Sequence, residues 1–277
     1  MSKQRRTALV TGGSRGIGRA TAIALAKNGF DVAISARTVK EGDHDLSGSL
    51  QDTAAKIEAE GAHVLLIPMD LSDREAVAAA ADKFLAEFGR CDLLFNNGIY
   101  QSEAAEARFF LETPIEEMQN ILAGNVIAPA VLIQKLMPSM IERGCGTIIN
   151  MTSAVTYMKP PGVVGEGGWS MVYAASKGAI DKFASVLNVE YSGRGIRTFT
   201  TEPGFVAYGE RLRQFVELYH TVPVSPPESC AEAILWLMDS PDADRLLDKR
   251  VNLPSLTEKH GLLPDWDGPG TMYPKDS

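Results

Sequence analysis

The segment Thr11-Gly-Gly-Ser-Arg-Gly-Ile-Gly18 follows an apolar run of strand type, Ala8–Thr11, and leads directly into a helical run. Gly12, Gly16 and Gly18 allow the chain to turn tightly and to bring its backbone N–H groups against a pyrophosphate at a helix N-terminus. A glycine cluster by itself is a weak signal, and a glycine turn without a ligand is the alternative. The strand–turn–helix context favours the ligand, because phosphate binding needs both the turn and the helix. The segment therefore predicts a dinucleotide site in an α/β fold.

Strand-like and helix-like stretches alternate along most of the chain. The strand candidates are continuous apolar runs, as in parallel strands covered by helices on both faces. Repeated strand–helix–strand units imply right-handed crossovers and a doubly wound parallel sheet, the Rossmann fold. No repeat or long linker divides the sequence, so we predict a single domain over residues 1–277, with a substrate lid at 207–222 and an irregular tail at 252–277. The predicted strands are Ala8–Thr11, Asp31–Ala36, His63–Pro68, Leu93–Asn96, Thr147–Met151 and Thr198–Thr201.

The composition argues against several classes of protein. The 277 residues include 27 Lys and Arg against 35 Asp and Glu, and the net charge of −8 is too acidic for a protein that binds nucleic acid. No apolar run approaches the roughly 20 residues that span a bilayer, and the lead before Thr7 is too short for a signal peptide. Neither the three cysteines nor the four histidines have the spacing of a disulfide framework or a metal site. We expect a soluble, cytoplasmic protein that binds no metal, nucleic acid or membrane.

The residues after the second predicted strand indicate which dinucleotide is bound. An acid there hydrogen-bonds the ribose 2′-hydroxyl of NAD and repels the 2′-phosphate of NADP. This chain has Ala36-Arg37 instead, and Arg15 stands in the glycine-rich turn. A guanidinium binds phosphate through two parallel hydrogen bonds, so the two arginines favour NADP over NAD. The alternative is that Arg37 is only a solvated loop residue.

Tyr173 and Lys177 stand four residues apart at the start of a predicted helix, and hence on one face of it. An ammonium beside a phenol favours the phenolate and lowers the pKa of the tyrosine, which makes the tyrosine usable as a general acid–base near neutral pH. Upstream, the run Thr147–Ser153 ends a strand with hydroxyl residues at the edge of the sheet where α/β proteins bind ligands. Together these features predict a catalytic site.

On these motifs the sequence resembles the short-chain dehydrogenase/reductase family, over roughly residues 5 to 210. Beyond the glycine-rich turn and the Tyr–Lys pair, it shares four further segments with the family. Asp70-Leu71 matches the pair that contacts the adenine, and Asn125 matches the catalytic asparagine. Asn96-Asn97-Gly98 falls on the segment after the fourth strand, and Pro203-Gly204 on the turn after the sixth.

The resemblance implies a role for each residue of the site. Tyr173 donates or removes the substrate proton, and Ser153 hydrogen-bonds the carbonyl or alcohol oxygen. Lys177 holds the nicotinamide ribose and acidifies Tyr173, while Asn125 holds a water that links Lys177 to solvent. The catalytic set is therefore Asn125, Ser153, Tyr173 and Lys177. The cofactor set is Gly12, Ser14, Arg15, Gly16, Ile17, Gly18, Arg37, Asp70, Leu71, Asn97, Gly98, Tyr173, Lys177, Pro203, Gly204 and Val206.

The chain also departs from the family pattern. Either Ile99 replaces the second glycine that is usual after Asn97-Gly98, or one residue is deleted there. Tyr208 takes the position of a threonine that bonds the nicotinamide carboxamide. The gap between Ser153 and Tyr173 is longer than usual, which makes Thr152 the alternative hydroxyl.

Two insertions and the C-terminal end depart as well. Residues 40–50 form a polar insertion after the second strand, and residues 160–168 form one that is rich in Gly and Pro. We predict that the second insertion closes over the active site, the alternative being a static surface decoration. The segment Val251–Leu256 lacks the pattern of the usual short C-terminal strand.

The sequence therefore predicts an NADP(H)-dependent oxidoreductase that interconverts a small-molecule ketone or aldehyde and the corresponding alcohol. A non-catalytic NADP-binding sensor, an enoyl reductase and a non-redox lyase or epimerase are the alternatives. The intact catalytic set argues against the sensor, and the close Tyr–Lys spacing argues against the enoyl reductase. The helical runs Val126–Ile141 and Ala174–Val189 are more apolar than one buried face requires, so we expect a homodimer or homotetramer built on them.

Overall fold

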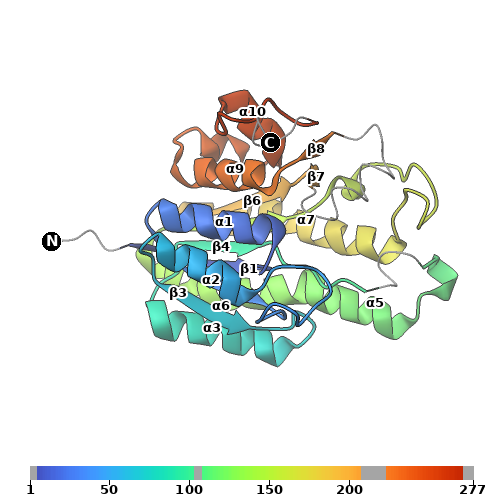
Figure 1. The fold of residues 1–277 in the computed structure, drawn as a ribbon, viewed down its shortest axis with the longest axis horizontal. Coiled ribbons are helices and arrows are strands. Elements are labelled where there is room, and N and C mark those ends of the chain that lie inside the picture. The colour runs from blue at the N-terminus through green and yellow to red at the C-terminus, as the bar shows by residue number, and fades with distance from the viewer. Residues whose placement is uncertain (1–4, 103–107, 207–222, 271–277) are drawn as a thin grey trace.

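A computed structural model describes residues 5–102, 108–206 and 223–270 of the chain. Its centre is a seven-stranded parallel sheet with the strand order β3-β2-β1-β4-β5-β6-β9 (Figure 1). The order reverses between β1 and β4, which is the doubly wound arrangement expected from the sequence. The strands of this sheet are β1 (Arg6–Thr11), β2 (Phe30–Ala36), β3 (Val64–Pro68), β4 (Leu93–Asn96), β5 (Gly146–Met151), β6 (Ile196–Glu202) and β9 (Arg250–Asn252).

Helices cover both faces of the sheet, and this explains why the strands are mostly apolar and do not alternate between apolar and polar residues. In β1, Ala8 and Val10 pack into the core on one face, whereas Leu9 packs into the core on the other. Successive side chains of a strand point to opposite faces, so a strand buried on both is apolar at neighbouring positions and not only at alternate ones. The covering helices are α1 (Gly16–Lys27), α2 (Leu50–Ala59) and α9 (Pro227–Asp239) on the first face, and α3 (Arg74–Phe88), α6 (Ala128–Arg143) and α7 (Met171–Tyr191) on the second.

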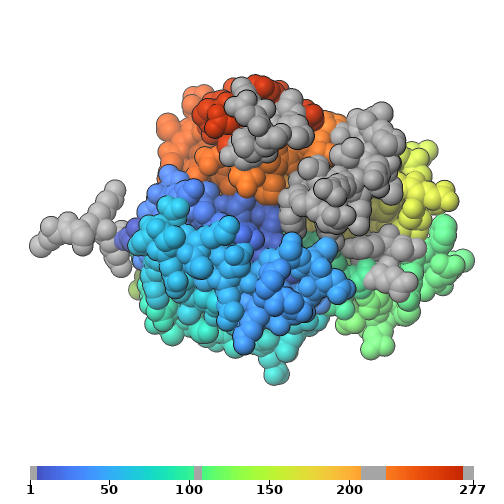
Figure 2. Space-filling view, in the orientation of Figure 1, coloured from blue at the N-terminus to red at the C-terminus, as the bar shows by residue number. Residues whose placement is uncertain are grey.

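The C-terminal end is more regular than the sequence predicted. The expectation of an irregular tail from 252 without a strand is wrong, since β9 pairs with β6 and is followed by α10 (Leu253–His260). Asn252 caps α10 by accepting a hydrogen bond from the Ser255 N–H at 3.0 Å. In the space-filling view, the orange surface of α9 adjoins the blue surface of the N-terminal half, where α1 packs against α9, and the red surface of α10 lies beyond it (Figure 2). A short parallel pair is formed by β7 (Phe205–Val206) and β8 (Val224–Ser225). The predicted lid at 207–222 lies outside the described residues.

The sequence predicted that no apolar run is long enough to span a bilayer, and one helix of the structure corrects this prediction. α5 (Ile115–Leu122), a π-helical turn (Ala123–Ile127) and α6 run on continuously over 29 residues, and by length and composition this helix passes that test. Half of its most apolar window is buried inside the fold. The core helix of a soluble protein has the same length and composition, so the signal for a membrane is weak.

The two insertions take defined conformations. Residues 40–50 form a loop that ends where Ser49 caps α2 through the Asp52 N–H. Residues 160–168 form a compact exposed turn, in which the Gly168 and Glu166 N–H groups both donate to the Val163 carbonyl. The predicted closure of this turn over the active site stays a prediction.

Candidate active site

The glycine-rich turn joins β1 to α1 and lines one end of a large cavity. Gly12 and Gly16 have φ of +71° and +54°, a region that side chains disfavour. The Gly12 and Gly13 N–H groups donate to the Ser35 carbonyl at 2.8 and 3.0 Å, which fixes the turn against β2. A Cβ on Gly18 would lie only 2.2 Å from the Gly12 carbonyl oxygen. Gly18 therefore lets α1 pack against the turn, and it does not itself line the cavity.

The cavity has a volume of about 640 Å³ and runs along the carboxyl edge of the sheet. It contains most of the residues that the sequence predicted for a cofactor, but Gly18 and Gly204 are not among its walls. The catalytic candidates Ser153 and Asn125 also lie behind the walls, whereas Tyr173 and Lys177 line it. The predicted residues that line it are Gly12, Ser14, Arg15, Gly16, Ile17, Arg37, Asp70, Leu71, Asn97, Gly98, Tyr173, Lys177, Pro203 and Val206.

The segment after β4 forms the floor of the cavity. The Thr11 hydroxyl accepts from the Asn97 and Gly98 N–H groups at 3.0 and 2.8 Å, and the Asn97 side chain donates to the Thr11 carbonyl at 2.9 Å. A Cβ on Gly98 would lie 3.0 Å from the Gly12 nitrogen, so a larger residue would press on the glycine-rich turn. Ile99, which departs from the family pattern, also lines the cavity. Tyr208 lies outside the described residues.

Tyr173 stands near the start of α7, where Ser170 caps the helix by accepting from the Tyr173 N–H at 3.3 Å. The phenol of Tyr173 is hydrogen-bonded to the Ser153 side chain. Burial raises the pKa of Tyr173, and the hydrogen bond from Ser153 opposes part of that rise. Thr152, the alternative hydroxyl, instead donates to the Thr201 carbonyl at 2.9 Å. The partner of Tyr173 is therefore Ser153, despite the long insertion between them.

Lys177 lines the same end of the cavity and is almost completely buried. Its Nζ donates to the Met151 carbonyl at 2.9 Å, and burial lowers the pKa of Lys177 to about 8. The sequence predicted that this ammonium acidifies Tyr173, and that role stays a prediction. In the described structure burial is the largest influence on the pKa of Tyr173, and it raises that pKa.

Asn125 lies in the π-helical turn Ala123–Ile127, where the extra residue turns its side chain into the fold. Its Oδ1 accepts from the Tyr100 N–H at 2.7 Å, and its Nδ2 donates to the Ser176 hydroxyl at 3.2 Å. That hydroxyl donates to the Tyr173 carbonyl at 2.8 Å. Asn125 thus links the loop after β4 to the first turns of α7. The water-holding role that the resemblance implies for it stays a prediction.

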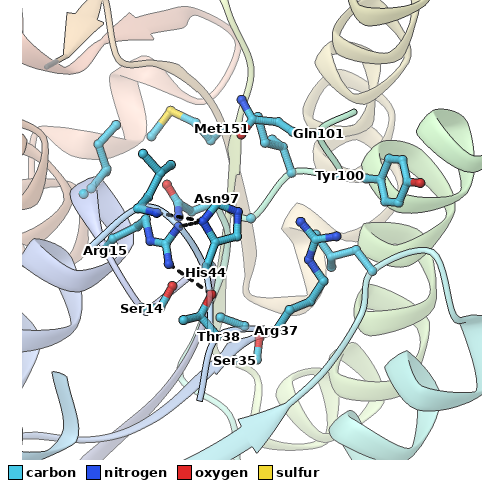
Figure 3. A pocket seen from close by; sticks show the side chains of 18 of the residues that line it. Ser14, Arg15, Ser35, Arg37, Thr38, His44, Asn97, Tyr100, Gln101 and Met151 are labelled. Atoms are coloured by element: carbon cyan, nitrogen blue, oxygen red, sulfur yellow. Dashed lines mark hydrogen bonds between the residues drawn. The ribbon is translucent and has the colours of Figure 1, made fainter. Parts of the chain in front are cut away.

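The end of the cavity beside the glycine-rich turn and the end of β2 is where the sequence predicts the adenosine of the cofactor, and we call it the adenosine end. Both predicted arginines line it (Figure 3). Arg37 forms an ion pair with Asp70, with Nη1 and Oδ2 3.9 Å apart. Arg15 directs Nη2 to the Thr38 hydroxyl and to the Gly48 carbonyl, both at 3.0 Å. The two guanidinium groups therefore face one cavity, while each also contacts protein acceptors.

Several residues of the cavity were not predicted as site residues. Most of them flank predicted ones in the chain, such as Thr38 beside Arg37 and Met151 two residues before Ser153, and neighbourhood in the chain would have found them. His44, Asp45 and Leu46 come from the insertion at 40–50, which carries no motif. The remaining wall residues outside the predicted cofactor and catalytic sets are Ser35, Met69, Tyr100, Gln101 and Ser102, together with Ala36, Ile99 and Thr152, which the sequence analysis discussed for other reasons.

The cavity fits a nicotinamide dinucleotide. Backbone N–H groups at the helix N-terminus suit a pyrophosphate, the close Gly12–Gly98 approach leaves room beside the turn, and arginines line one end. Among the described residues, no group of three or more His, Cys, Asp or Glu side chains is placed to hold a metal ion.

Comparison with known proteins agrees with this geometry. The chain matches the short chain dehydrogenase family over residues 6–215. It is 34% identical over 207 residues to a short chain dehydrogenase of Pseudocercospora fijiensis, a match that covers 73% of this chain and 60% of that protein. It is 31% identical over 205 residues to the 3-oxoacyl-[acyl-carrier-protein] reductase of Staphylococcus aureus, with 74% and 76% covered. The chain thus spans less than two thirds of the length of the first of these relatives.

Solved structures show the same fold. A metagenomic short-chain oxidoreductase in complex with NADP superposes with a TM-score of 0.68 at 27% identity, covering 89% of this chain and 96% of the other. Acetoin dehydrogenase from Enterobacter cloacae superposes with a TM-score of 0.74 at 26% identity, with 91% and 94% covered. The family match, the parallel sheet and the Tyr173–Lys177 pair lead to one conclusion: this chain belongs to the short-chain dehydrogenase/reductase family.

Proposed function

We propose that this protein is an NADP(H)-dependent oxidoreductase that interconverts a ketone or aldehyde and the corresponding alcohol. The observation that carries the proposal is the Tyr173 phenol, hydrogen-bonded to Ser153 and facing the same cavity as Lys177 and the glycine-rich turn. A phenol and a hydroxyl side by side can hold one carbonyl oxygen between them. The cavity joins this pair to a phosphate-binding turn, so a dinucleotide and a small carbonyl compound can occupy it together.

The chemistry that follows is a proton transfer at Tyr173. When bound, the nicotinamide supplies or takes up the hydride. Because burial raises the pKa of Tyr173, the phenol keeps its proton at neutral pH and can donate it to a carbonyl oxygen. Ser153 orients that oxygen by hydrogen bonding. Lys177, whose Nζ is held at the Met151 carbonyl, lies where it can bind the nicotinamide ribose.

Three features support NADP as the preferred cofactor. Ala36 places no carboxylate beside the ribose, and Arg15 and Arg37 both line the adenosine end of the cavity. Arg37 is about half exposed and pairs with Asp70 across 3.9 Å, a loose contact that leaves it able to turn toward a phosphate. The metagenomic relative was solved in complex with NADP, which is consistent with this choice.

Exposed apolar residues on α7 and at the junction with α6 support a homodimer. Val186 and Val189 on α7 are exposed by 52% and 85%, and Ile127 at the start of α6 is exposed by 47%. Exposed apolar residues on the two helices predicted for the interface are the kind of surface that association buries. Light scattering should give at least twice the 29.9 kDa of one chain, and Val189→Lys should lower that mass. A monomeric mass for the unmodified protein at micromolar concentration would contradict the homodimer.

A screen for carbonyl-dependent oxidation of NADPH tests the reaction itself. The purified protein is mixed with NADPH and with ketones and aldehydes of graded size, and the loss of NADPH absorbance is followed. We expect turnover with at least one carbonyl compound and none without a carbonyl. Tight NADPH binding with no turnover across the panel would instead support the sensor alternative.

A further inference from the structure

The insertion Lys40–Leu50 has a fixed shape made by its own polar groups. The Asp43 carboxylate accepts from the Lys40 N–H at 2.8 Å, and the Glu41 carboxylate accepts from the Gly48 N–H at 3.0 Å. Side chains that hydrogen-bond to nearby backbone N–H groups in this way hold a turn. The insertion is therefore a built loop and not a loose connection between β2 and α2.

The loop is docked on the glycine-rich turn. Arg15 Nη2 donates to the Thr38 hydroxyl and to the Gly48 carbonyl, both at 3.0 Å. Gly48 has φ of +100°, and a Cβ there would lie 2.7 Å from the Ser14 carbonyl oxygen, so only glycine permits this close approach. The loop thereby becomes one wall of the cavity, and the residues it contributes are His44, Asp45 and Leu46.

The hydrogen bonds of His44 show which ring nitrogen carries the proton. Its Nδ1 accepts from the Leu46 N–H at 3.0 Å and lies 3.3 Å from Nη1 of Arg15, which can only donate. A nitrogen that accepts these bonds has no proton, so the proton of the neutral ring is on Nε2. The loop thus holds Nδ1 and leaves an N–H donor on the opposite side of a ring that lines the cavity (Figure 3).

The other charges at this end of the cavity make that donor important. Arg37 has Asp70 as an ion-pair partner, and Asp45 adds a second carboxylate to the wall. Nη2 of Arg15 already donates hydrogen bonds to the Thr38 hydroxyl and to the Gly48 carbonyl. This end of the cavity wall therefore carries two arginines and two carboxylates, and an anion in the cavity gains from each further N–H group.

We propose that His44 is a specificity-determining residue for the cofactor, whose Nε2–H donates to the 2′-phosphate of NADP between Arg15 and Arg37. The proposal rests on the NADP preference proposed above. In this view the insertion has two tasks, since it fixes the Arg15 guanidinium and supplies a third phosphate donor from outside the glycine-rich turn and β2. A chain without the insertion would lose both.

His44→Asn separates the donor from the shape of the loop. An asparagine keeps an oxygen near the Nδ1 position that can accept from the Leu46 N–H, but it has no donor at the Nε2 position. Calorimetric titration of the purified protein with NADP⁺ and with NAD⁺, without substrate, gives both dissociation constants. Because a hydrogen bond to a charged group is at stake, we expect about tenfold weaker binding of NADP⁺ and unchanged binding of NAD⁺.

Two further variants test whether the effect of His44→Asn comes from the lost donor. His44→Gln restores an N–H near the Nε2 position without the Nδ1 acceptor, and it should recover part of the NADP⁺ affinity. Ser47→Ala changes an exposed residue of the same loop outside the cavity, and it should alter neither dissociation constant. Equal weakening of NADP⁺ and NAD⁺ binding by His44→Asn, or no weakening of either, would overturn the role of His44. If the unmodified protein binds NAD⁺ as tightly as NADP⁺, the proposed cofactor preference fails as well.

Discussion

The two ends of the cofactor cavity differ in how far their charged groups are exposed to water. At the adenosine end, Arg37 is about half exposed and Asp70 beside it is 40% exposed, and the insertion adds the exposed His44. At the catalytic end, Lys177 is almost fully buried and its pKa is lowered to about 8, while the pKa of the buried Tyr173 is raised. One end therefore keeps its charges in contact with water, and the other end suppresses them.

This contrast separates recognition from chemistry. Where water screens the charges, the outcome depends on which charged and hydrogen-bonding groups are present, because each contributes modestly and independently. Where water is excluded, burial decides which side chain holds a proton, and single contacts such as Ser153 on Tyr173 carry large consequences. Substitutions at the adenosine end should therefore change cofactor choice, whereas substitutions at the catalytic end should change turnover and stability.

The largest effect is expected from Tyr173→Phe. This change removes the transferable proton and leaves the ring in place, so kcat should fall by about 10²–10⁴-fold. The dissociation constant for NADPH should stay within about twofold, because the phenol hydroxyl belongs to the chemistry and not to recognition. Steady-state kinetics and a fluorescence titration with NADPH measure the two quantities. A loss of turnover below tenfold would contradict the role given to Tyr173.

Ala36→Asp should act at the other end and leave kcat nearly unchanged. A carboxylate at this position faces the 2′-phosphate and can hydrogen-bond a 2′-hydroxyl instead, so the ratio of kcat/KM for NADPH over NADH should fall about 100-fold. Ala36→Asn is the matched control, since it has the same shape without the charge. If the asparagine variant shifts the ratio as far as the aspartate variant, crowding and not charge sets the cofactor preference.

The sequence predicted the fold well because burial on both faces leaves a direct trace in it. A strand such as β5 is buried at all six positions, and its centre, Thr147–Ile149, reads as a run of β-branched residues. β9 left no such trace, since only Val251 of its three residues is buried. A strand with one buried residue has no periodicity to detect, and its pairing with β6 depends on tertiary contacts. α10 differs from β9, since Leu253, Leu256 and Thr257 are buried at helical spacing and Asn252 and Gly261 cap its two ends.

The site was predicted to different depths at its two ends. Motifs located the glycine-rich turn, Arg37, Tyr173 and Lys177, and these three side chains line one cavity together with most of the turn. They could not show that Arg15 binds the loop at Gly48, because this contact joins residues 33 positions apart through an insertion without a motif. Nor could they give the pKa of Lys177, which burial determines. Residue identity predicts a location, whereas proton affinity depends on the packing around it.

The smallest effect, on stability, gives the most direct test of the buried end. The pKa of Lys177 falls from 10.5 to about 8 on folding, so between these values the unfolded chain binds more protons than the folded one. The free energy of unfolding therefore rises with pH across this window, and below it the cost of burying the ammonium is fully present. Lys177→Met removes that cost. Without cofactor and at pH 7, the variant should be more stable by about 1–3 kcal/mol, even though its turnover is lost.

Urea unfolding of the two proteins at pH 7 and near pH 10 measures this difference. The advantage of Lys177→Met should shrink at the higher pH, because the unmodified protein then holds a neutral lysine. Lys135→Met is the control, since Lys135 is a partly exposed lysine of α6 that pairs with Asp82 at 2.9 Å and should give no such pH-dependent gain. An advantage that is absent at pH 7, or equal at both pH values, would show that burial of Lys177 does not oppose folding. The contrast between the two ends of the cavity would then lie in their residues alone and not in their exposure to water.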